Sequence, residues 1–318
     1  MIDYKGFIED NFLIIDKNGQ IVPFKFNDTQ NFYWEILNNR YPTLEGVREN
    51  ILKFRQPGFS SLIDAIFTVD FIFSEEGKQP ITFSDIYSHK DDETRILFKR
   101  VSFYLDSYLQ KSGIERKHYL REDTDNRIEG KNLSTIAAYT ANAKVSGRGG
   151  TKQNIHESEP SFYPNTEILN ANDLILGVEQ QVLDGVGKIF RESTGNIIGD
   201  FFNEEYEFGK LPGAKFKSNF LGWWLHHEYQ LTPPANWIVP EKYRNLMMLH
   251  GATKEACYWH YNKINSAKPS DRMRMSREYP CDDIEAFMSQ GKGYFDIEAL
   301  RHYKDVFKKD AMTGGLSV

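Results

Sequence analysis

The stretch Lys53-Phe54-Arg55-Gln56-Pro57-Gly58-Phe59-Ser60-Ser61 is the most informative part of this chain. It follows a strand-like Ile51-Leu52 and precedes an apolar segment with helical spacing, which is the context of a phosphate-binding loop. Backbone N–H groups near Gly58, at the start of a helix, would hold phosphate oxygens. The lysine that normally follows the glycine is missing, because Phe59 stands between Gly58 and Ser60.

Phosphate charge nevertheless needs a cation. Lys53 and Arg55 are the two on this loop, and their positions alone do not decide between them. The hydroxyl of Ser60 is a candidate Mg²⁺ ligand, as the Ser or Thr of such loops is. The alternative is a plain strand–turn–helix in which Pro57-Gly58 only makes the turn.

A second motif is acidic and reads Ile155-His156-Glu157-Ser158-Glu159-Pro160. An acidic residue at the end of a strand, beside the phosphates, can orient water for attack on a γ-phosphate, and Glu159 is the candidate for this base. Ser158 stands where many ATPases carry a Mg²⁺-associated aspartate. The strand expected before this motif covers residues 151–154 and is unusually polar. An exposed acidic turn is the alternative interpretation.

A third motif, Arg191-Glu192-Ser193-Thr194-Gly195-Asn196, follows a short strand predicted over residues 188–191. Small hydroxyl residues at the end of a strand can sense a γ-phosphate and relay its loss, which makes Ser193 and Thr194 candidates for this role. A simple Ser/Thr/Gly/Asn turn is the alternative.

Strand-like and helical segments alternate along most of the chain, which predicts an α/β domain with a largely parallel sheet. A clear amphipathic helix is expected over about 91–112, and strands over 81–83 and 133–140. From about residue 225 the character changes, and helical segments are expected over 240–264.

The composition allows one large domain or two small ones, since the 318 residues are 40% hydrophobic. No apolar run approaches the ~20 residues that span a bilayer, and the first residues lack a secretion-signal pattern. Two cysteines, Cys257 and Cys281, fit a reducing compartment. The net charge of −6 leaves only local basic patches for nucleic acid. One basic run, Lys263, Lys268, Arg272, Arg274 and Arg277, is a candidate for phosphate contacts with DNA, and a solvated helical face is the alternative.

The order and spacing of the motifs resemble the large subunit of the tailed-phage terminase, the ATP-driven motor that packages viral DNA. Residues 53–61 resemble its variant phosphate loop, in which the lysine moves to the front. Residues 155–162 resemble its second acidic motif, and 192–196 its coupling motif. Gln30 resembles its adenine-reading glutamine, and 278–287 the segment that closes the ATPase half. The likeness covers about residues 25–300.

The resemblance implies a P-loop NTPase of the RecA/ASCE type with a small helical lid. Its expected parts are an ATPase core over 1–228, a lid over 229–300 and a linker over 301–318. ATP and Mg²⁺ are the implied cofactors, with Ser60 and Ser158 at the metal and Arg55 acting in cis on the γ-phosphate beside Glu159 and Lys53. The expected nucleotide contacts are Gln30, Lys53, Arg55, Gln56, Pro57, Gly58, Phe59, Ser60, Ser61, Ser193 and Thr194.

The implied function is that of an ATP-hydrolysing motor domain that drives double-stranded viral DNA into a procapsid. The implied partners are DNA, the portal protein, the small terminase subunit and further copies of this chain in a ring, with a monomer when free. The expected location is the host cytoplasm, docked on the portal, without a membrane. The nuclease half of the family is not expected within these residues. The alternatives are a RecA- or helicase-like nucleic-acid ATPase, and a nucleotide-binding module without turnover.

Overall fold

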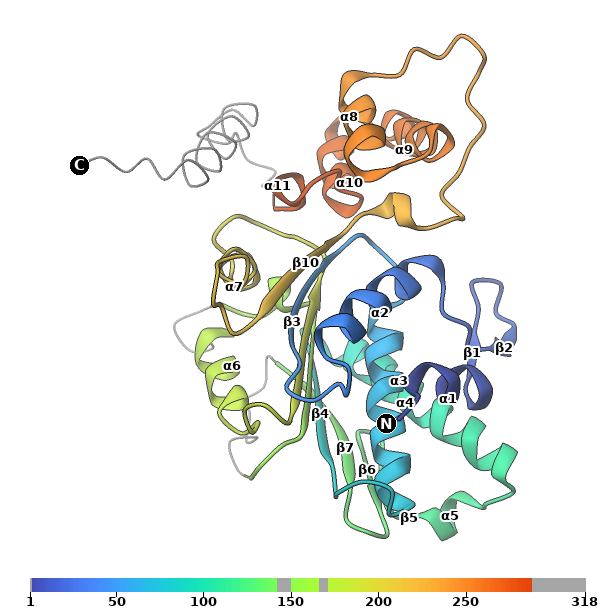
Figure 1. Ribbon diagram of the computed structural model, residues 1–318, viewed down its shortest axis with the longest axis vertical. Helices are drawn as coiled ribbons and strands as arrows, with labels where there is room; N and C mark the ends of the chain where they lie inside the picture. Colours follow the sequence, from blue (N-terminus) through green and yellow to red (C-terminus); the bar gives the residue numbers. More distant parts are fainter. Residues whose placement is uncertain (1, 142–149, 166–170, 288–318) are drawn as a thin grey trace, which may run out of the picture.

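An eight-stranded sheet forms the centre of the protein (Figure 1). The computed structural model describes residues 2–141, 150–165 and 171–287. The strand order is β10-β3-β9-β8-β4-β7-β6-β5. In chain order, these strands are β3 (Arg48–Lys53), β4 (Phe83–Ser88), β5 (Leu120–Asp123), β6 (Arg127–Gly130), β7 (Thr135–Thr140), β8 (Asn154–Ser158), β9 (Lys188–Ser193) and β10 (Lys217–Leu221). A separate antiparallel pair consists of β1 (Leu13–Ile15) and β2 (Ile21–Pro23).

The sheet is parallel from β10 through β7, and only β6 and β5 pair antiparallel at one edge. The predicted α/β class with a largely parallel sheet is therefore confirmed. Strand β9 lies between β3 and β8, so the carboxyl ends of these three strands are neighbours. In open parallel sheets, ligands bind at the carboxyl ends of the strands.

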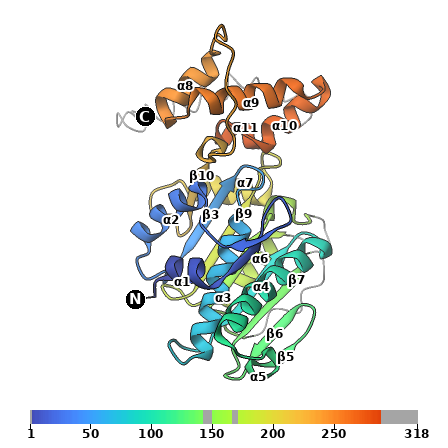
Figure 2. The same cartoon turned by 90° about the vertical axis from the view of Figure 1, so that its right-hand side faces the viewer.

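Helices cover both faces of the sheet (Figures 1 and 2). One face carries α1 (Tyr4–Asn11), α2 (Asp28–Arg40), α3 (Phe59–Glu75) and α4 (Asp91–Ser112). The other carries α6 (Ala171–Glu179) and α7 (Phe201–Phe208). A short helix, α5 (Arg116–Tyr119), precedes β5. None of the helices within these described ranges is both long and apolar enough to cross a bilayer.

Local signals set where several helices begin and end. Helix α2 starts with a capping box, in which Asn27 and Gln30 each bond the other's backbone N–H, at 2.9 and 3.0 Å. Asp200 caps α7 by accepting the N–H of Asn203 at 2.8 Å. Helix α4 covers the predicted span and ends at Gly113, whose φ of 67° glycine adopts without strain.

A helical segment lies beyond the carboxyl ends of β3 and β10 (Figure 1). It contains α8 (Glu241–His250), α9 (Lys254–Ser266), α10 (Arg272–Glu278) and α11 (Asp283–Ala286). Its apolar core is centred on Trp223, which is fully buried and stacks on His260 with ring centroids 4.4 Å apart. Phe54, the first residue after β3, belongs to the same core, so the phosphate-loop candidate and this segment share packing.

Several predicted boundaries were wrong. The strand expected over 151–154 is instead β8, which begins at Asn154, and the one expected over 81–83 begins at Phe83. Strand β8 is polar but buried, because its charged side chains have partners: Glu157 accepts from Arg191 at 2.7 Å. Hydrophobic periodicity does not reveal such a strand. Helix α1 was not predicted. Residues 288–300 of the expected lid and the expected linker over 301–318 lie outside the described part of the chain.

Candidate active site

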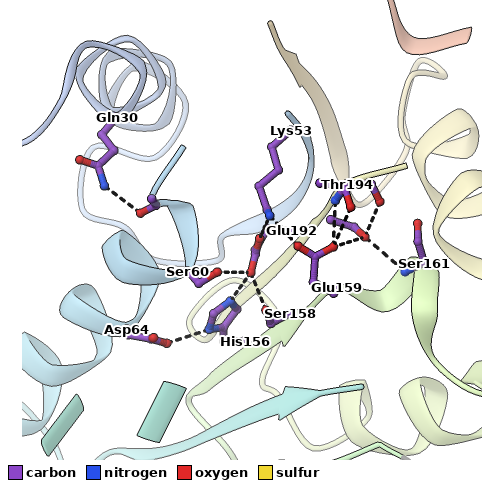
Figure 3. Close-up of polar contacts among 12 residues, drawn as sticks. Gln30, Lys53, Ser60, Asp64, His156, Ser158, Glu159, Ser161, Glu192 and Thr194 are labelled. Atoms are coloured by element: carbon purple, nitrogen blue, oxygen red, sulfur yellow. Dashed lines mark hydrogen bonds and ion pairs between the residues drawn. The ribbon is translucent and has the colours of Figure 1, made fainter. Parts of the chain in front are cut away.

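Residues from all three motifs meet at the carboxyl ends of β3, β8 and β9 (Figure 3). Lys53 is the last residue of β3, and its Nζ lies 2.6 Å from Oε1 of Glu159 and 3.1 Å from Oε2 of Glu192. Burial alone would lower the pKa of Lys53, but these two carboxylates raise it above its ordinary value. Lys53 is therefore a fixed cation at the centre of the site.

Glu192 is the most connected carboxylate of this cluster. Its Oε1 accepts from the hydroxyls of Ser60 and Ser158, both at 2.7 Å, and from His156 Nε2 at 3.2 Å. The residue is fully buried. Burial alone would raise its pKa, but the charge of Lys53 and the hydrogen bond from His156 lower the pKa of Glu192 to about 2. It is thus an anion directly beneath the loop that carries Ser60.

His156 connects this anion to the phosphate-loop helix. Its Nδ1 lies 2.9 Å from Asp64 on α3, and Asp64 also accepts from Arg100 on α4 at 2.9 Å. Burial would lower the pKa of His156, but the hydrogen bonds to Asp64 and Glu192 raise it to about 9. The imidazole is therefore charged at neutral pH and donates from both nitrogens, which couples α3 to β9.

Glu159 is held in an unusual backbone conformation at the end of β8. Its φ of 55° lies in the left-handed region, which is costly for a residue with a side chain, and such strained residues cluster at functional sites. Its Oε2 accepts from the Thr194 N–H at 3.0 Å, from the Thr194 hydroxyl at 3.2 Å and from Ser193 Oγ at 3.1 Å. Glu159, the predicted water-activating residue, is therefore hydrogen-bonded to Ser193 and Thr194 of the predicted coupling motif.

The loop itself has the backbone of an anion site. Gly58, with φ 81°, is the N-cap of the 17-residue α3 and leaves the first N–H groups of that helix without a side-chain cap. Phe59, which replaces the usual lysine, is buried and packs edge-on against Tyr33 with centroids 5.2 Å apart. The position after the glycine therefore serves the apolar core, and the buried cation of the cluster, Lys53, lies at the end of β3.

The other predicted nucleotide contacts lie around the loop. Gln30 donates from Nε2 to the Gly58 carbonyl at 2.8 Å, so its amide contacts the loop as well as its own helix cap. The Pro57 carbonyl accepts from Asn27 at 3.0 Å, and Gln56 is exposed with φ 62°. The Ser61 carbonyl accepts from Tyr104 at 3.4 Å. Nucleotide contacts by these residues stay predictions.

Arg55 does not join the buried cluster. Its guanidinium pairs with Glu278 of α10 at 3.2 Å, and its backbone N–H donates to the Glu278 carbonyl at 2.9 Å. Of the two candidate cations, the structure places Lys53 among the carboxylates and Arg55 against the helical segment.

A magnesium ion is implied by the loop chemistry, and the residues present fit it. Mg²⁺ takes one or two protein oxygens and completes its shell with phosphates and water. Ser60 offers a partly exposed hydroxyl, with the Glu192 carboxylate directly behind it. Across residues 2–141, 150–165 and 171–287, no three His, Cys, Asp or Glu side chains could hold a metal ion unaided.

Sequence reasoning missed Glu192 as a site residue. It was treated only as the first residue of the coupling motif, whereas the structure makes it the meeting point of all three motifs. An acidic residue directly after the strand predicted over 188–191 and directly before Ser193-Thr194 was the available signal.

Neither the protein-family models nor the curated proteins searched contain a match to this sequence. Solved structures do match. The large terminase of bacteriophage HK97 superposes with a TM-score of 0.58 at 12% identity, over 88% of this chain and 55% of that one. The ATPase domain of the Thermus phage P74-26 large terminase has a TM-score of 0.45 at 14% identity, over 79% and 97%.

The strand order, with the loop between β3 and α3 at the carboxyl end of β3, is the arrangement of a P-loop α/β fold. Within that class, the fold is similar to that of the HK97 large terminase, as the superposition shows. The chain spans about half the length of the HK97 protein.

Proposed function

We propose that this chain is the ATP-hydrolysing motor domain of a viral terminase large subunit, driving double-stranded DNA into a procapsid. The observation that carries the proposal is the meeting of Lys53, Ser60 and Glu159 at one end of the sheet, beside an uncapped helix N-terminus. This arrangement combines a phosphate cradle, a cation and a carboxylate base, which are the parts that phosphoryl transfer requires.

In this proposal, the N–H groups at Gly58 and the Lys53 ammonium bind the β- and γ-phosphates, and Ser60 holds Mg²⁺. Glu159 orients the attacking water. Because Ser193 and Thr194 contact Glu159, loss of the γ-phosphate would change their contacts and be passed on through β9. Gln30 and Arg55 complete the nucleotide contacts, with Arg55 leaving Glu278 for the γ-phosphate.

The helical segment would act as the lid. Arg277 donates to the Asn196 carbonyl at 3.0 Å, and a side chain at Gly195 would collide with the Ala286 carbonyl at 2.1 Å. The coupling motif therefore lies directly against this segment, which gives nucleotide turnover a contact through which to move it.

Expected boundaries are a core over 1–228, a lid over 229–300 and a linker over 301–318. DNA, the portal, the small terminase subunit and a ring of copies are the proposed partners, in the host cytoplasm.

Steady-state hydrolysis with Glu159→Gln tests this function. We expect Mg²⁺-dependent ATPase activity in the wild type, stimulated by double-stranded more than by single-stranded DNA. Loss of general-base catalysis should lower kcat by about 10²–10⁴-fold while nucleotide binding persists. Glu204→Gln, on the exposed start of α7, is the matched control and should leave kcat unchanged.

Three results would contradict the proposal. Unchanged hydrolysis in Glu159→Gln would remove this residue from the chemistry. Nucleotide binding without any Mg²⁺-dependent turnover, even with DNA and portal present, would favour a binding module. Stimulation by single strands alone would favour a helicase-like ATPase.

A further inference from the structure

We propose that Glu192 supplies the carboxylate that faces the divalent cation of the bound nucleotide, in place of an acidic residue at position 158. The inference rests on the proposed function and names the residue that completes its metal site. It starts from a chemical gap: Ser158 ends β8 where a carboxylate is expected, and a neutral hydroxyl cannot supply the negative charge that Mg²⁺ needs.

The strand register shows how the neighbouring strand fills this gap. Ser158 of β8 and Glu192 of β9 are direct Cα partners in the parallel pairing. Partners on adjacent strands lie about 4.8 Å apart with their side chains on the same face. A glutamate is one methylene longer than an aspartate, so a carboxylate on β9 reaches the place that an acid at 158 would occupy. The 2.7 Å contact between Ser158 Oγ and Glu192 Oε1 shows that it does.

The contacts of Glu192 point to the metal side of the site. Its Oε1 lies 2.7 Å from Ser60 Oγ, the hydroxyl expected to ligate Mg²⁺. Glu159, the other carboxylate near Lys53, has its Oε2 bound by Ser193 and Thr194 instead. The two carboxylates thus have different neighbours. Glu192 contacts the Ser60 hydroxyl, the expected Mg²⁺ ligand, and Glu159 contacts Ser193 and Thr194 of the coupling motif (Figure 3).

Three buried donors hold Glu192 as an anion before any metal arrives. Lys53, His156 and Ser158 all contact it, and Asp64 in turn orients His156. Such supporting hydrogen bonds fix a ligand and commonly change metal affinity by about 10–100-fold when removed. This support distinguishes Glu192 from a carboxylate that is merely buried near the loop.

The test measures binding of the slowly hydrolysed nucleotide ATPγS, with and without Mg²⁺, so that it does not depend on turnover. Wild type should bind more tightly with Mg²⁺. Glu192→Gln should lose about 10–100-fold of this Mg²⁺-dependent gain. Adding Ser158→Asp to Glu192→Gln returns a carboxylate to the partner strand and should restore most of it. Glu204→Gln, the same change on the exposed start of α7, is the matched control and should retain the gain.

A structural role for Glu192 predicts a different pattern: lower stability in all Glu192 variants and no rescue by Ser158→Asp. Melting of each variant without nucleotide checks folding. If Glu192→Gln does not fold, Glu192→Asp keeps the charge but shortens its reach, and a loss of the Mg²⁺ gain in that variant supports the inference. If Glu192→Gln or Glu192→Asp keeps the full Mg²⁺-dependent gain in ATPγS affinity, while the wild type shows that gain, this inference alone is overturned. A wild type that does not respond to Mg²⁺ overturns it together with the proposed function.

Discussion

Lys53 and Arg55 are two residues apart, yet they belong to different regions of the molecule. The side chain of Lys53 is 7% exposed and lies between two carboxylates at the end of the sheet. The side chain of Arg55 is 54% exposed and pairs with Glu278 of the helical segment. The first region is a buried cluster whose charges are fixed by strand register; the second is an open contact between a loop and the lid candidate.

The difference in burial distinguishes a fixed cation, Lys53, from an exposed one, Arg55, on the same phosphate-loop candidate. A charge held by buried partners is ready for phosphate without reorganisation, which is how electrostatic preorganisation lowers a barrier. An exposed pair is screened by water and is worth at most about 1 kcal/mol, so it can exchange Glu278 for a phosphate at little cost. On this basis we expect Lys53 to serve phosphate binding and Arg55 to serve the step in which the lid moves.

Lys53→Met should have the largest effect on stability. It keeps the apolar stem but removes the ammonium that Glu159 and Glu192 share, and removing one partner of a buried pair costs about 3–5 kcal/mol. We expect this loss in the free energy of unfolding of the nucleotide-free protein, measured by urea denaturation. Nucleotide binding, followed by calorimetry, should be lost as well.

Arg55→Met is the matched control for this substitution, since it removes a cation from the same loop. Its free energy of unfolding should change by no more than about 1 kcal/mol. Equal destabilisation by the two variants would contradict the division into a fixed and a movable cation.

The stability of the helical segment should decrease in acid because of His260. This residue accepts from the Tyr243 hydroxyl at 2.7 Å and donates to the Tyr279 carbonyl at 2.8 Å, so it is neutral. Burial, with a smaller contribution from Lys242, lowers its pKa to about 3. Because the folded pKa is depressed, protonation favours unfolding. The stabilisation is complete above the unfolded pKa of about 6.5 and declines toward pH 3.

This one group can contribute a slope of at most ~1.4 kcal/mol per pH unit between pH 6.5 and 3. His260→Gln keeps one donor and one acceptor but does not titrate. Its unfolding free energy should be lower at pH 7, because it loses the stack on Trp223, and should fall less steeply toward pH 4. Parallel pH profiles of the two proteins would show that His260 is not the acid-sensitive group.

Local chemistry made much of the fold predictable. The helix over 91–112 depends on residues close together in the chain, and it was confirmed. The helix caps at Asn27 and Asp200 are equally local. Glu159 was expected at the end of a strand beside the phosphate-loop candidate, and its contact with Lys53 places it there, because parallel strands bring their carboxyl ends to one edge of the sheet.

What could not be predicted depends on contacts between distant strands. The role of Glu192 arises from its register against Ser158, and a single sequence carries no register between β8 and β9. The polar strand β8 was misplaced because its burial relies on partners such as Arg191 from another strand. The choice between Lys53 and Arg55 likewise required the position of Glu278, far along the chain.

The smallest effect is expected at the contact between Arg55 and Glu278. A double-mutant cycle with Arg55→Met and Glu278→Gln, measured by urea unfolding, should give a coupling energy of about 0–1 kcal/mol, because the arginine is half exposed. The segment should stay attached in both variants, since the Arg55 N–H still donates to the Glu278 carbonyl and Phe54 remains in the shared core. A coupling energy of about 3 kcal/mol, in the range of a buried pair, would contradict this. The lid contact would then be as fixed as the cluster around Lys53, and Arg55 could not leave Glu278 at each turnover.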